Sequence, residues 1–365
     1  MVMARIGLDV SILEEPRWTG VERAAAGLVR ALGDAPGHLE ILLYSRRPVC
    51  WPFPLGRNLQ PRPIGGPGRT VLWREVALPA ALARDGIDVL HSPVAAIPLL
   101  TRVPRIATVH EMPWLRYPGI EGRPREAVYR ARIRIAARVA IRLIVPSRAV
   151  ARDLIELAPR AAGKVEVLPF GVEEMFKPLP DDRRREQLRR RLSLPDDPVV
   201  LFVGKPRRRK NLPVLLQAVR MLRDHMRPAP TLVLAGVNAA EIPPSPGVVP
   251  LGYIADQDLV HLYNLASVLA YPSLSEGFGF PPLEAMACGT PVVAARAGAL
   301  PEISGKAALL IDPGSPEDLA DAIRSAIEDP SLRRDLRHRG QSLVRTYQWP
   351  GVAERALDLL TMVAA

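Results

Sequence analysis

The chain of 365 residues is too long for one ordinary domain and suits two domains of about 150–180 residues each. Its net charge of +11, carried by 44 arginines and 5 lysines, indicates an anionic partner such as a nucleotide sugar, a lipid headgroup or nucleic acid. A membrane-spanning helix is excluded because no run of about 18 uncharged apolar residues is present. The two cysteines, Cys50 and Cys288, cannot build a disulfide framework, so we expect a cytoplasmic protein. We expect no signal peptide, because Asp9 interrupts the short apolar run near the start of the sequence.

A strand, a loop and a helix open the chain. Arg5–Val10 predicts a buried strand, and Val21–Leu32 predicts a helix because its apolar residues recur at helical spacing. Gly20 stands just before this helix, as in a phosphate-binding turn, but the dinucleotide fingerprint G-x-G-x-x-G is missing. A nicotinamide enzyme is therefore disfavoured, and a plain helix-start glycine is an equally good interpretation.

Short strands and one long irregular segment fill much of the first half. Strands are expected at Ile41–Tyr44, Ile87–His91 and Arg105–His110. The segment 48–69 is rich in Pro, Gly and Arg, and we expect an irregular excursion that holds an acceptor site, since long loops are commonly functional.

His110 is the candidate functional side chain of the first half. It ends a predicted strand and is followed by Glu111, but Trp114 stands where a zinc helix His-Glu-x-x-His needs its second histidine. A strand-end histidine is usually structural, so the residues alone leave both interpretations open.

The segment Arg116–Arg152 contains ten arginines and only two glutamates, Glu121 and Glu126. Four recur every fourth residue: Arg130, Arg134, Arg138 and Arg142. This spacing predicts a basic stripe down one side of a helix. A solvated helix face and contact with an anionic membrane are the two interpretations.

The second half begins with a charged helix, expected at Asp181–Leu192, and a fully apolar strand, Val199–Gly204. The strand leads into four consecutive cations, Arg207–Lys210, and a helix follows at Leu212–Leu222. The Walker pattern is absent, and nuclear targeting, nucleic-acid contact and a diphosphate clamp are the alternatives. The position of the cations between a buried strand and a helix favours the clamp.

Asp256-Gln-Asp258 looks like a D-x-D metal motif. However, Asp256 precedes a predicted helix at Leu259–Ser267 in the manner of an N-cap, and Asp258 falls in its first turn. We therefore expect neither a metal site nor a cofactor.

Two glutamates flank a glycine-aromatic loop, Gly277-Phe278-Gly279-Phe280. Glu276 follows a strand end, and Glu284 falls in the first turn of a helix predicted at Pro282–Cys288. Ligands of open α/β sheets bind at the carboxyl ends of strands, where carboxylates grip hydroxyls and loop amides receive an anion. For either glutamate alone, a structural role favoured by the helix dipole is the alternative.

Glu276-x7-Glu284 resembles the signature of the retaining group 1 (family 4) glycosyltransferases, which have the GT-B fold. The resemblance extends along nearly the whole chain. It implies an α/β protein of two doubly wound Rossmann-like domains facing across a cleft, with a C-terminal helix crossing back to the first domain. The expected boundaries are 1–175 for the acceptor-binding domain, 176–346 for the nucleotide-sugar-binding domain and 347–365 for the helix.

The resemblance also implies roles for single residues. Arg209 and Lys210 match cations that stabilise a leaving diphosphate. Glu276 matches a residue that holds hydroxyls of the transferred sugar, Glu284 one that holds the ribose, and His110 one that reaches the reaction centre. The other donor-binding positions implied are Gly20, Gly204, Lys205, Ile254, Gly277, Phe278, Gly279 and Phe280. Lys205 stands where the family more commonly has arginine.

These expectations predict a hexosyltransferase of polysaccharide biosynthesis that retains anomeric configuration. A GDP- or UDP-sugar is the expected donor, with a mannose-like sugar favoured by the Arg-Lys-Asn version of the basic loop. The acceptor would be a glycan, a lipid-linked molecule or a small molecule. No carboxylate matches a covalent nucleophile, so the expected route is attack on the face that the diphosphate leaves, with a phosphate oxygen as base. Peripheral contact with the inner face of the membrane is expected through Arg116–Arg152.

Three alternatives stay open. The same scaffold could serve a nucleotide-sugar epimerase or a phosphorylase, or a sugar-nucleotide binder that has lost catalysis. A nucleic-acid-binding protein is motivated by the pI of about 10.2. With 5% aromatic residues the chain lacks the interleaved aromatics of a stacking platform, so no nucleic-acid partner is expected.

Overall fold

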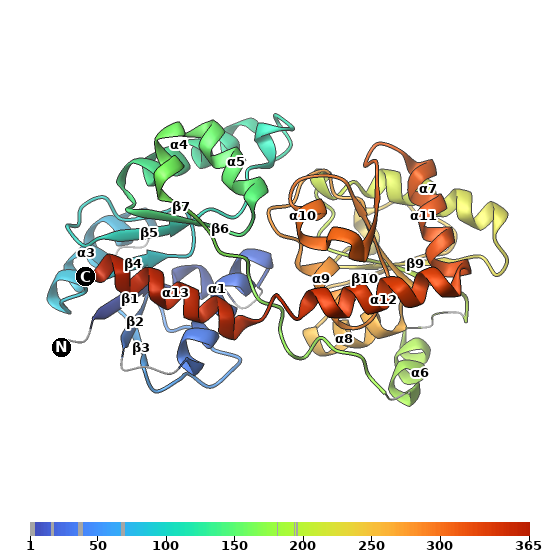
Figure 1. Cartoon of the computed structure of the whole chain (residues 1–365), viewed down its shortest axis with the longest axis horizontal. Coiled ribbons are helices and arrows are strands. Elements are labelled where there is room, and N and C mark those ends of the chain that lie inside the picture. The colour runs from blue at the N-terminus through green and yellow to red at the C-terminus, as the bar shows by residue number, and fades with distance from the viewer. Residues whose placement is uncertain are drawn as a thin grey trace. The chain divides into compact units, whose positions relative to one another are not determined.

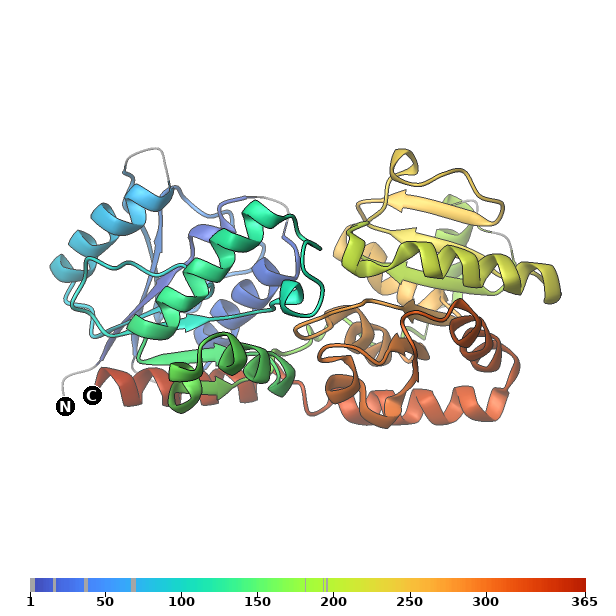
Figure 2. The ribbon, with the colours of Figure 1, turned by 90° about the horizontal axis from the view of Figure 1, so that it is seen from above.

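The computed structural model describes residues 4–15, 18–35, 39–66, 70–180, 182–192, 194 and 196–365. The chain divides into two compact units, one made of Met1–Gly171 with Tyr347–Ala365 and the other of Val172–Thr346. Each unit is a parallel sheet with helices on both faces (Figures 1 and 2). The predicted class of two doubly wound α/β units is confirmed.

Within the described residues, the first unit holds a seven-stranded sheet in the order β3-β2-β1-β4-β5-β6-β7. The strands are β1 Arg5–Asp9, β2 Glu40–Ser45, β3 Leu59–Pro63, β4 Val89–Ser92, β5 Arg105–Thr108, β6 Arg142–Val145 and β7 Val165–Val167. The prediction of an irregular segment was wrong for β3. Its prolines, Pro61 and Pro63, are tolerated because β3 is an edge strand. Residues 67–69 of that segment lie outside the described residues.

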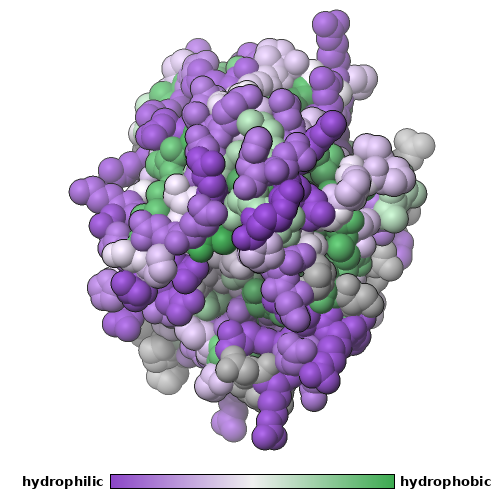
Figure 3. Space-filling view, turned by 90° about the vertical axis from the view of Figure 1, so that its right-hand side faces the viewer, coloured by the Kyte–Doolittle hydropathy of each residue, from purple (hydrophilic) through white to green (hydrophobic). Residues whose placement is uncertain are grey.

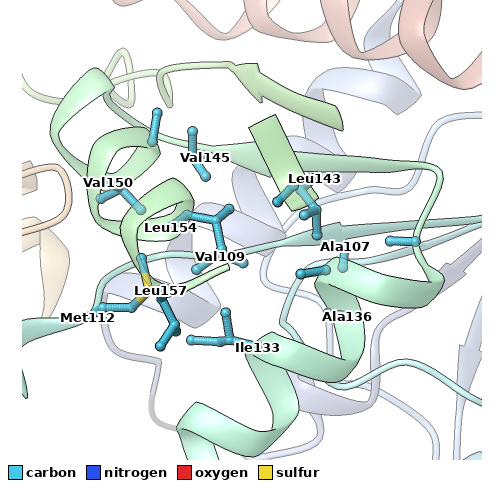
Figure 4. Close-up of a cluster of buried hydrophobic side chains, with 14 of the residues drawn as sticks. Ala107, Val109, Met112, Ile133, Ala136, Leu143, Val145, Val150, Leu154 and Leu157 are labelled. Carbon is cyan, nitrogen blue, oxygen red and sulfur yellow. The ribbon is translucent and has the colours of Figure 1, made fainter. Parts of the chain in front are cut away.

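The helices of the first unit are α1 Gly20–Asp34, α2 Thr70–Leu72, α3 Leu78–Arg84, α4 Arg123–Val139, α5 Arg148–Leu157 and α13 Trp349–Ala364, with a π-helical turn Trp73–Ala77 between α2 and α3. Side chains of α4 and α5 meet those of β5 and β6 in a buried cluster (Figure 4). A second cluster joins α3 to β2 and β4. The pairing of Ser92 with Ala107 puts both clusters on the same face of the sheet.

The C-terminal helix α13 packs against α1 in the first unit, as predicted (Figure 1). Trp349 at its start occupies a notch between two glycines. A Cβ atom on Gly27 would lie 2.0 Å from Trp349 Cζ2, and one on Gly171 would lie 2.5 Å from Trp349 Cγ. Glycine at both positions therefore allows the indole to dock.

Within the described residues, the second unit holds a six-stranded sheet in the order β10-β9-β8-β11-β12-β13. The strands are β8 Val199–Val203, β9 Thr231–Ala235, β10 Val248–Gly252, β11 Val268–Tyr271, β12 Val292–Ala295 and β13 Ala308–Ile311. The helices are α6 Asp182–Arg191, α7 Leu212–His225, α8 Asp256–Leu265, α9 Phe280–Ala287, α10 Leu300–Ser304, α11 Pro316–Glu328 and α12 Pro330–Val344. Asp181, the predicted start of α6, lies outside the described residues.

The strand order reverses between β8 and β11, which are neighbours in the sheet although α7, β9, β10 and α8 separate them along the chain. The loops after these two strands therefore leave the sheet side by side. A reversal of this kind is where open α/β sheets bind ligands. The predicted basic loop and the predicted glutamate loop are the two loops concerned.

Two predicted helix starts were wrong by a few residues. Helix α9 begins at Phe280, so Glu284 lies in its second turn, because the proline pair fits inside the first turn and Gly279 with φ +106° ends the loop. Helix α8 begins at Asp256 itself, with Ala255 as N-cap. Asp256 is therefore no N-cap, although its carboxylate still lies in the first turn, where the helix dipole favours it.

The prediction of an arginine stripe on one helix was also wrong for one of its four residues. Arg142 lies in β6, because α4 ends at Val139 and the chain turns at Ala140. None of the helices in the described residues is long and apolar enough to span a lipid bilayer.

Candidate functional site

The basic loop and the glutamate loop meet in one buried ion cluster. Lys210 Nζ donates to Glu276 Oε1 at 2.8 Å, and Arg209 Nη1 donates to the same oxygen at 2.8 Å. Glu276 is 7% exposed and Lys210 8% exposed. Two cations therefore converge on one carboxylate oxygen at the point where the strand order reverses, and the cluster has a net positive charge.

The field of the two cations sets the charge state of Glu276. Burial by itself raises the pKa of this carboxyl group, but the nearby charges of Lys210 and Arg209 outweigh burial and hold the pKa below its ordinary value. Glu276 is therefore ionised at neutral pH.

Tyr271, the last residue of β11, completes the cluster. Lys210 Nζ donates to Tyr271 Oη, and the ammonium lies 4.4 Å from the centre of the Tyr271 ring. The phenol thus contacts the lysine with both its oxygen and its π face. Tyr271 was not among the predicted site residues. The available signal was an aromatic side chain at a strand end, next to a loop rich in cations.

A glycine holds the backbone of Glu276 in place. Ala299 N donates to Glu276 O at 2.9 Å, and a Cβ atom on Gly298 would lie 2.6 Å from the same oxygen. Gly298 also has φ +55°, which L side chains rarely adopt. The loop before α10 therefore presses directly on the glutamate loop, and Gly298 is a second residue that the predicted site lacked.

Glu284 is held by a different tyrosine. Tyr263 Oη of α8 donates to Glu284 Oε2 at 2.7 Å, and both side chains are buried. The Tyr263 ring packs edge-on against Phe176, with ring centres 5.8 Å apart. A side chain of α8 therefore sets the orientation of the Glu284 carboxylate. Tyr263 was also missed, because its contact depends on how α8 packs on α9.

The segment Gly277–Phe280 between the two glutamates is tightly packed, with residues 277–279 buried and Phe280 half-buried at the start of α9. The rings of Phe278 and Phe280 meet edge-to-face, with centres 5.0 Å apart. A Cβ atom on Gly279 would lie 2.9 Å from Leu300 Cδ2. Packing on both sides therefore holds the segment between Glu276 and Glu284 in one conformation.

The structure places the remaining predicted donor residues of the second unit at the same end of its sheet. Gly204 follows β8, and a Cβ atom there would lie 3.3 Å from Lys210 Cε, so glycine leaves room for the lysine stem. Lys205 is exposed next to it. Ile254 is half-buried in the turn between β10 and α8. Donor contacts by these residues stay predictions.

His110 and Gly20 belong to the first unit. His110 Nε2 lies 2.7 Å from Pro93 O, and since a carbonyl can only accept, Nε2 carries the hydrogen. Burial lowers the pKa of His110, so the ring is neutral at pH 7 with Nδ1 as the acceptor. The charge of Glu22, in the first turn of α1, opposes this shift, and Gly20 is the first residue of the same helix.

A second histidine, His91 of β4, is 1% exposed. Its Nε2 lies 2.9 Å from Thr108 Oγ1. Burial, with a smaller contribution from His110, lowers the pKa of His91 to about 4. His91 is therefore a neutral core residue.

No group of three or more His, Cys, Asp or Glu side chains in the described residues is arranged to hold a metal ion. Asp258 of the D-x-D sequence instead pairs with Arg191 of α6, at 2.6 Å. The chemistry that the site offers is charge stabilisation by two cations and hydroxyl binding by two carboxylates.

Two protein-family models match the sequence of this chain. The model of the glycosyl transferases group 1 family matches residues 184–343, and that of glycosyltransferase family 4 matches residues 18–175. Together the two matches cover most of the chain. The chain therefore belongs to the group 1 glycosyltransferases of the GT-B fold, as predicted from the Glu276-x7-Glu284 signature.

Two curated relatives show how far the likeness extends. The D-inositol 3-phosphate glycosyltransferase of Corynebacterium jeikeium is 36% identical over 231 residues, covering 58% of this chain and 55% of that protein. The O-antigen chain mannosyltransferase B of Escherichia coli is 34% identical over 168 residues, covering 43% and 44%. The chain thus spans about half the length of these relatives.

Solved structures agree over nearly the whole chain. Sucrose-phosphate synthase of Thermosynechococcus elongatus superposes with a TM-score of 0.76 at 22% identity, covering 99% of both chains. The Anabaena HepE protein in complex with UDP-glucose gives a TM-score of 0.75 at 19% identity, covering 99% of this chain and 100% of that one. At these identities the likeness establishes the fold.

Proposed function

We propose that this chain transfers a hexose from a nucleotide-diphosphate sugar to an acceptor hydroxyl with retention of anomeric configuration. The observation that carries the proposal is the convergence of Arg209 and Lys210 on Glu276 where the strand order reverses. Breaking the bond between the anomeric carbon and the diphosphate leaves negative charge on the diphosphate. Two pre-positioned cations stabilise that charge without reorganisation.

The roles of the two glutamates follow from their surroundings. Glu276 balances the cations in the free protein, and the arriving diphosphate supplies negative charge in its place, so that the carboxylate can turn to hydroxyls of the transferred sugar. Glu284, oriented by Tyr263, holds the ribose hydroxyls. His110, neutral and with Nδ1 accepting, acts from the first unit on the sugar at the reaction centre.

A GDP- or UDP-sugar with a mannose-like hexose is the donor that we propose. The O-antigen mannosyltransferase relative supports mannose, and the Arg-Lys-Asn version of the basic loop points the same way. We assign donor binding to residues 176–346 and acceptor binding to residues 1–175. The acceptor is a glycan, a lipid-linked molecule or a small molecule, reached at the cytoplasmic face of a membrane.

The test is to incubate the protein with GDP-mannose or UDP-glucose and an alkyl glycoside, and to follow anomeric protons by NMR. We expect an α-linked product from the α-linked donor. Lys210→Ala is expected to lower kcat by about 10²-fold, the usual effect of removing one charge-stabilising group. An inverted product, or wild-type turnover by Lys210→Ala, contradicts the proposal.

A further inference from the structure

The outer side of α4 carries apolar side chains where a surface helix normally carries polar ones. Its inner side packs against β5 and β6 in the buried cluster of Figure 4. At 100° per residue, Val128, Ala131 and Ile135 fall on the opposite side of the helix. Val128 is 50% exposed and Ile135 40%. These three residues form the apolar ridge of α4.

Arginines border the apolar ridge on both sides. Arg134 and Arg138 run along one side, while Arg125 and Arg132 run along the other, and all four are exposed. Within the described part of the chain, no ion pair joins Arg132, Arg134 or Arg138 to an acid. The helix also carries one glutamate, which is buried and accepts from the backbone amides of residues 119 and 121. The positive charge beside the ridge therefore lacks a counter-charge on α4.

The same face of the sheet exposes further apolar side chains beside α3. They are Val71, Leu72, Val76, Leu99 and Leu100, which are 45% to 70% exposed. Glu75 links residues 71–76 to the loop of Leu99 and Leu100, since its carboxylate accepts from Leu99 N at 2.8 Å.

The second unit is different. Its exposed large hydrophobic side chains among the described residues are Met175 and Tyr253. The face in Figure 3 is covered mainly by hydrophilic groups. Among the described residues, seven of the nine exposed large hydrophobic side chains of the first unit lie on the face that carries α3 and α4, the other two being Ile141 and Met362.

We propose that the outer side of α4 docks on the surface of a bilayer that contains anionic lipid. Aliphatic side chains insert at the boundary of headgroups and acyl chains, and guanidinium groups on both flanks reach the lipid phosphates. The exposed arginines on both flanks of the ridge, with no exposed acid on α4, favour an anionic lipid surface over a protein partner. The inference deepens the proposed function, since a docked first unit would meet a lipid-linked acceptor.

This surface differs from the arginine stripe predicted from the sequence. Arg142 lies in β6, and Arg130 is half-buried on the inner flank of α4. The docking groups are instead the apolar ridge and the arginines that border it.

The test is co-sedimentation of the full chain with phosphatidylcholine vesicles, with and without phosphatidylglycerol. The charge variant is Arg132→Gln/Arg134→Gln/Arg138→Gln. Its matched control is Arg220→Gln/Arg324→Gln/Arg334→Gln, which changes net charge equally on exposed positions of the second unit. We expect the charge variant to bind anionic vesicles about a hundredfold less than wild type, from about fivefold per arginine, and the control to bind nearly as wild type.

A third variant separates apolar insertion from charge. Val128→Asn/Ile135→Asn leaves net charge unchanged and is expected to lower vesicle binding at least tenfold. Equal losses in the charge variant and its control would overturn the proposal, and so would binding that does not rise with anionic lipid. Self-association without vesicles that Val128→Asn/Ile135→Asn abolishes would assign the ridge to a second copy of the chain and would also overturn it.

Titration of the same samples with GDP and UDP keeps the two proposals apart. All three variants are expected to bind the nucleotides as wild type does. Vesicle binding without nucleotide binding would contradict the proposed function alone, and the reverse result would contradict the docking alone. Thermal melting of each variant verifies folding, which substitution of exposed side chains is expected to preserve.

Discussion

One oxygen of Glu276 accepts from both Arg209 and Lys210, so the free protein already holds an anion where a diphosphate would bring one. The carboxylate and the donor compete for the same cations. The consequence is that neutralising Glu276 should act in opposite directions on binding and on transfer.

Glu276→Gln is expected to be less stable than wild type by about 3–5 kcal/mol in the free energy of unfolding, because it leaves two buried cations without a counter-charge. GDP or UDP returns that charge, so nucleoside diphosphates are expected to bind the variant more tightly than wild type. Transfer is expected to fall, since the amide holds sugar hydroxyls less well. Calorimetric titration and melting curves measure the first two effects. Weaker diphosphate binding at unchanged stability would remove Glu276 from the cation pair.

Tyr271 is a positioning residue in this scheme, since it acts through Lys210. Tyr271→Phe keeps the ring under the ammonium and removes the oxygen that accepts from it. A hydrogen bond to a charged group contributes about 1.5–3 kcal/mol, so we expect kcat to fall about tenfold or more with little change in KM. Steady-state kinetics on the same donor decide this, and an unchanged kcat would mean that the phenol oxygen is dispensable.

At the scale of elements, sequence patterns sufficed where a motif lies within one loop. The apolar strand before Lys210 and the spacing from Glu276 to Glu284 identified the two loops that meet in the ion cluster. Tyr263 and Tyr271 could not be predicted, because their roles depend on packing between elements far apart in the chain. The turn of α9 that holds Glu284 was misplaced because prolines fit several positions of a first helical turn.

The contact of α1 with α13 predicts that alanine at position 27 lowers stability, although alanine has the higher helix propensity. Gly27→Ala within an isolated helix would be stabilising by about 1 kcal/mol. Here a methyl group would collide with Trp349, 2.0 Å from its ring, so we expect a net destabilisation of about 1–3 kcal/mol. Urea unfolding measures the change, and Trp349→Leu in the same chain should recover part of it. A more stable Gly27→Ala would show that the indole does not occupy the notch.

For the whole molecule, stability should depend on pH through buried histidine. The pKa of His91 is lowered from 6.5 to about 4 in the folded chain, so folding favours the neutral ring. That contribution is fully present above pH 6.5 and is lost as the pH falls toward 4. The shift corresponds to about 3 kcal/mol.

His91→Gln is therefore expected to flatten the loss of stability between pH 6.5 and 4.5, a window above the ordinary pKa of carboxyl groups. His110 acts in the same direction and stays in both proteins, which makes wild type the matched control. Chemical unfolding at intervals of pH measures the effect. An unchanged pH dependence would show that His91 is not a neutral core residue.

The central claim is that the second unit binds the diphosphate of a nucleotide sugar through Arg209 and Lys210. Calorimetric titration of wild type and Lys210→Ala with GDP, GMP, UDP and UMP tests it most directly. We predict that one diphosphate binds wild type at least tenfold more tightly than its monophosphate, and that Lys210→Ala loses this preference. Equal affinity of wild type for diphosphate and monophosphate, with both bases, would contradict the account.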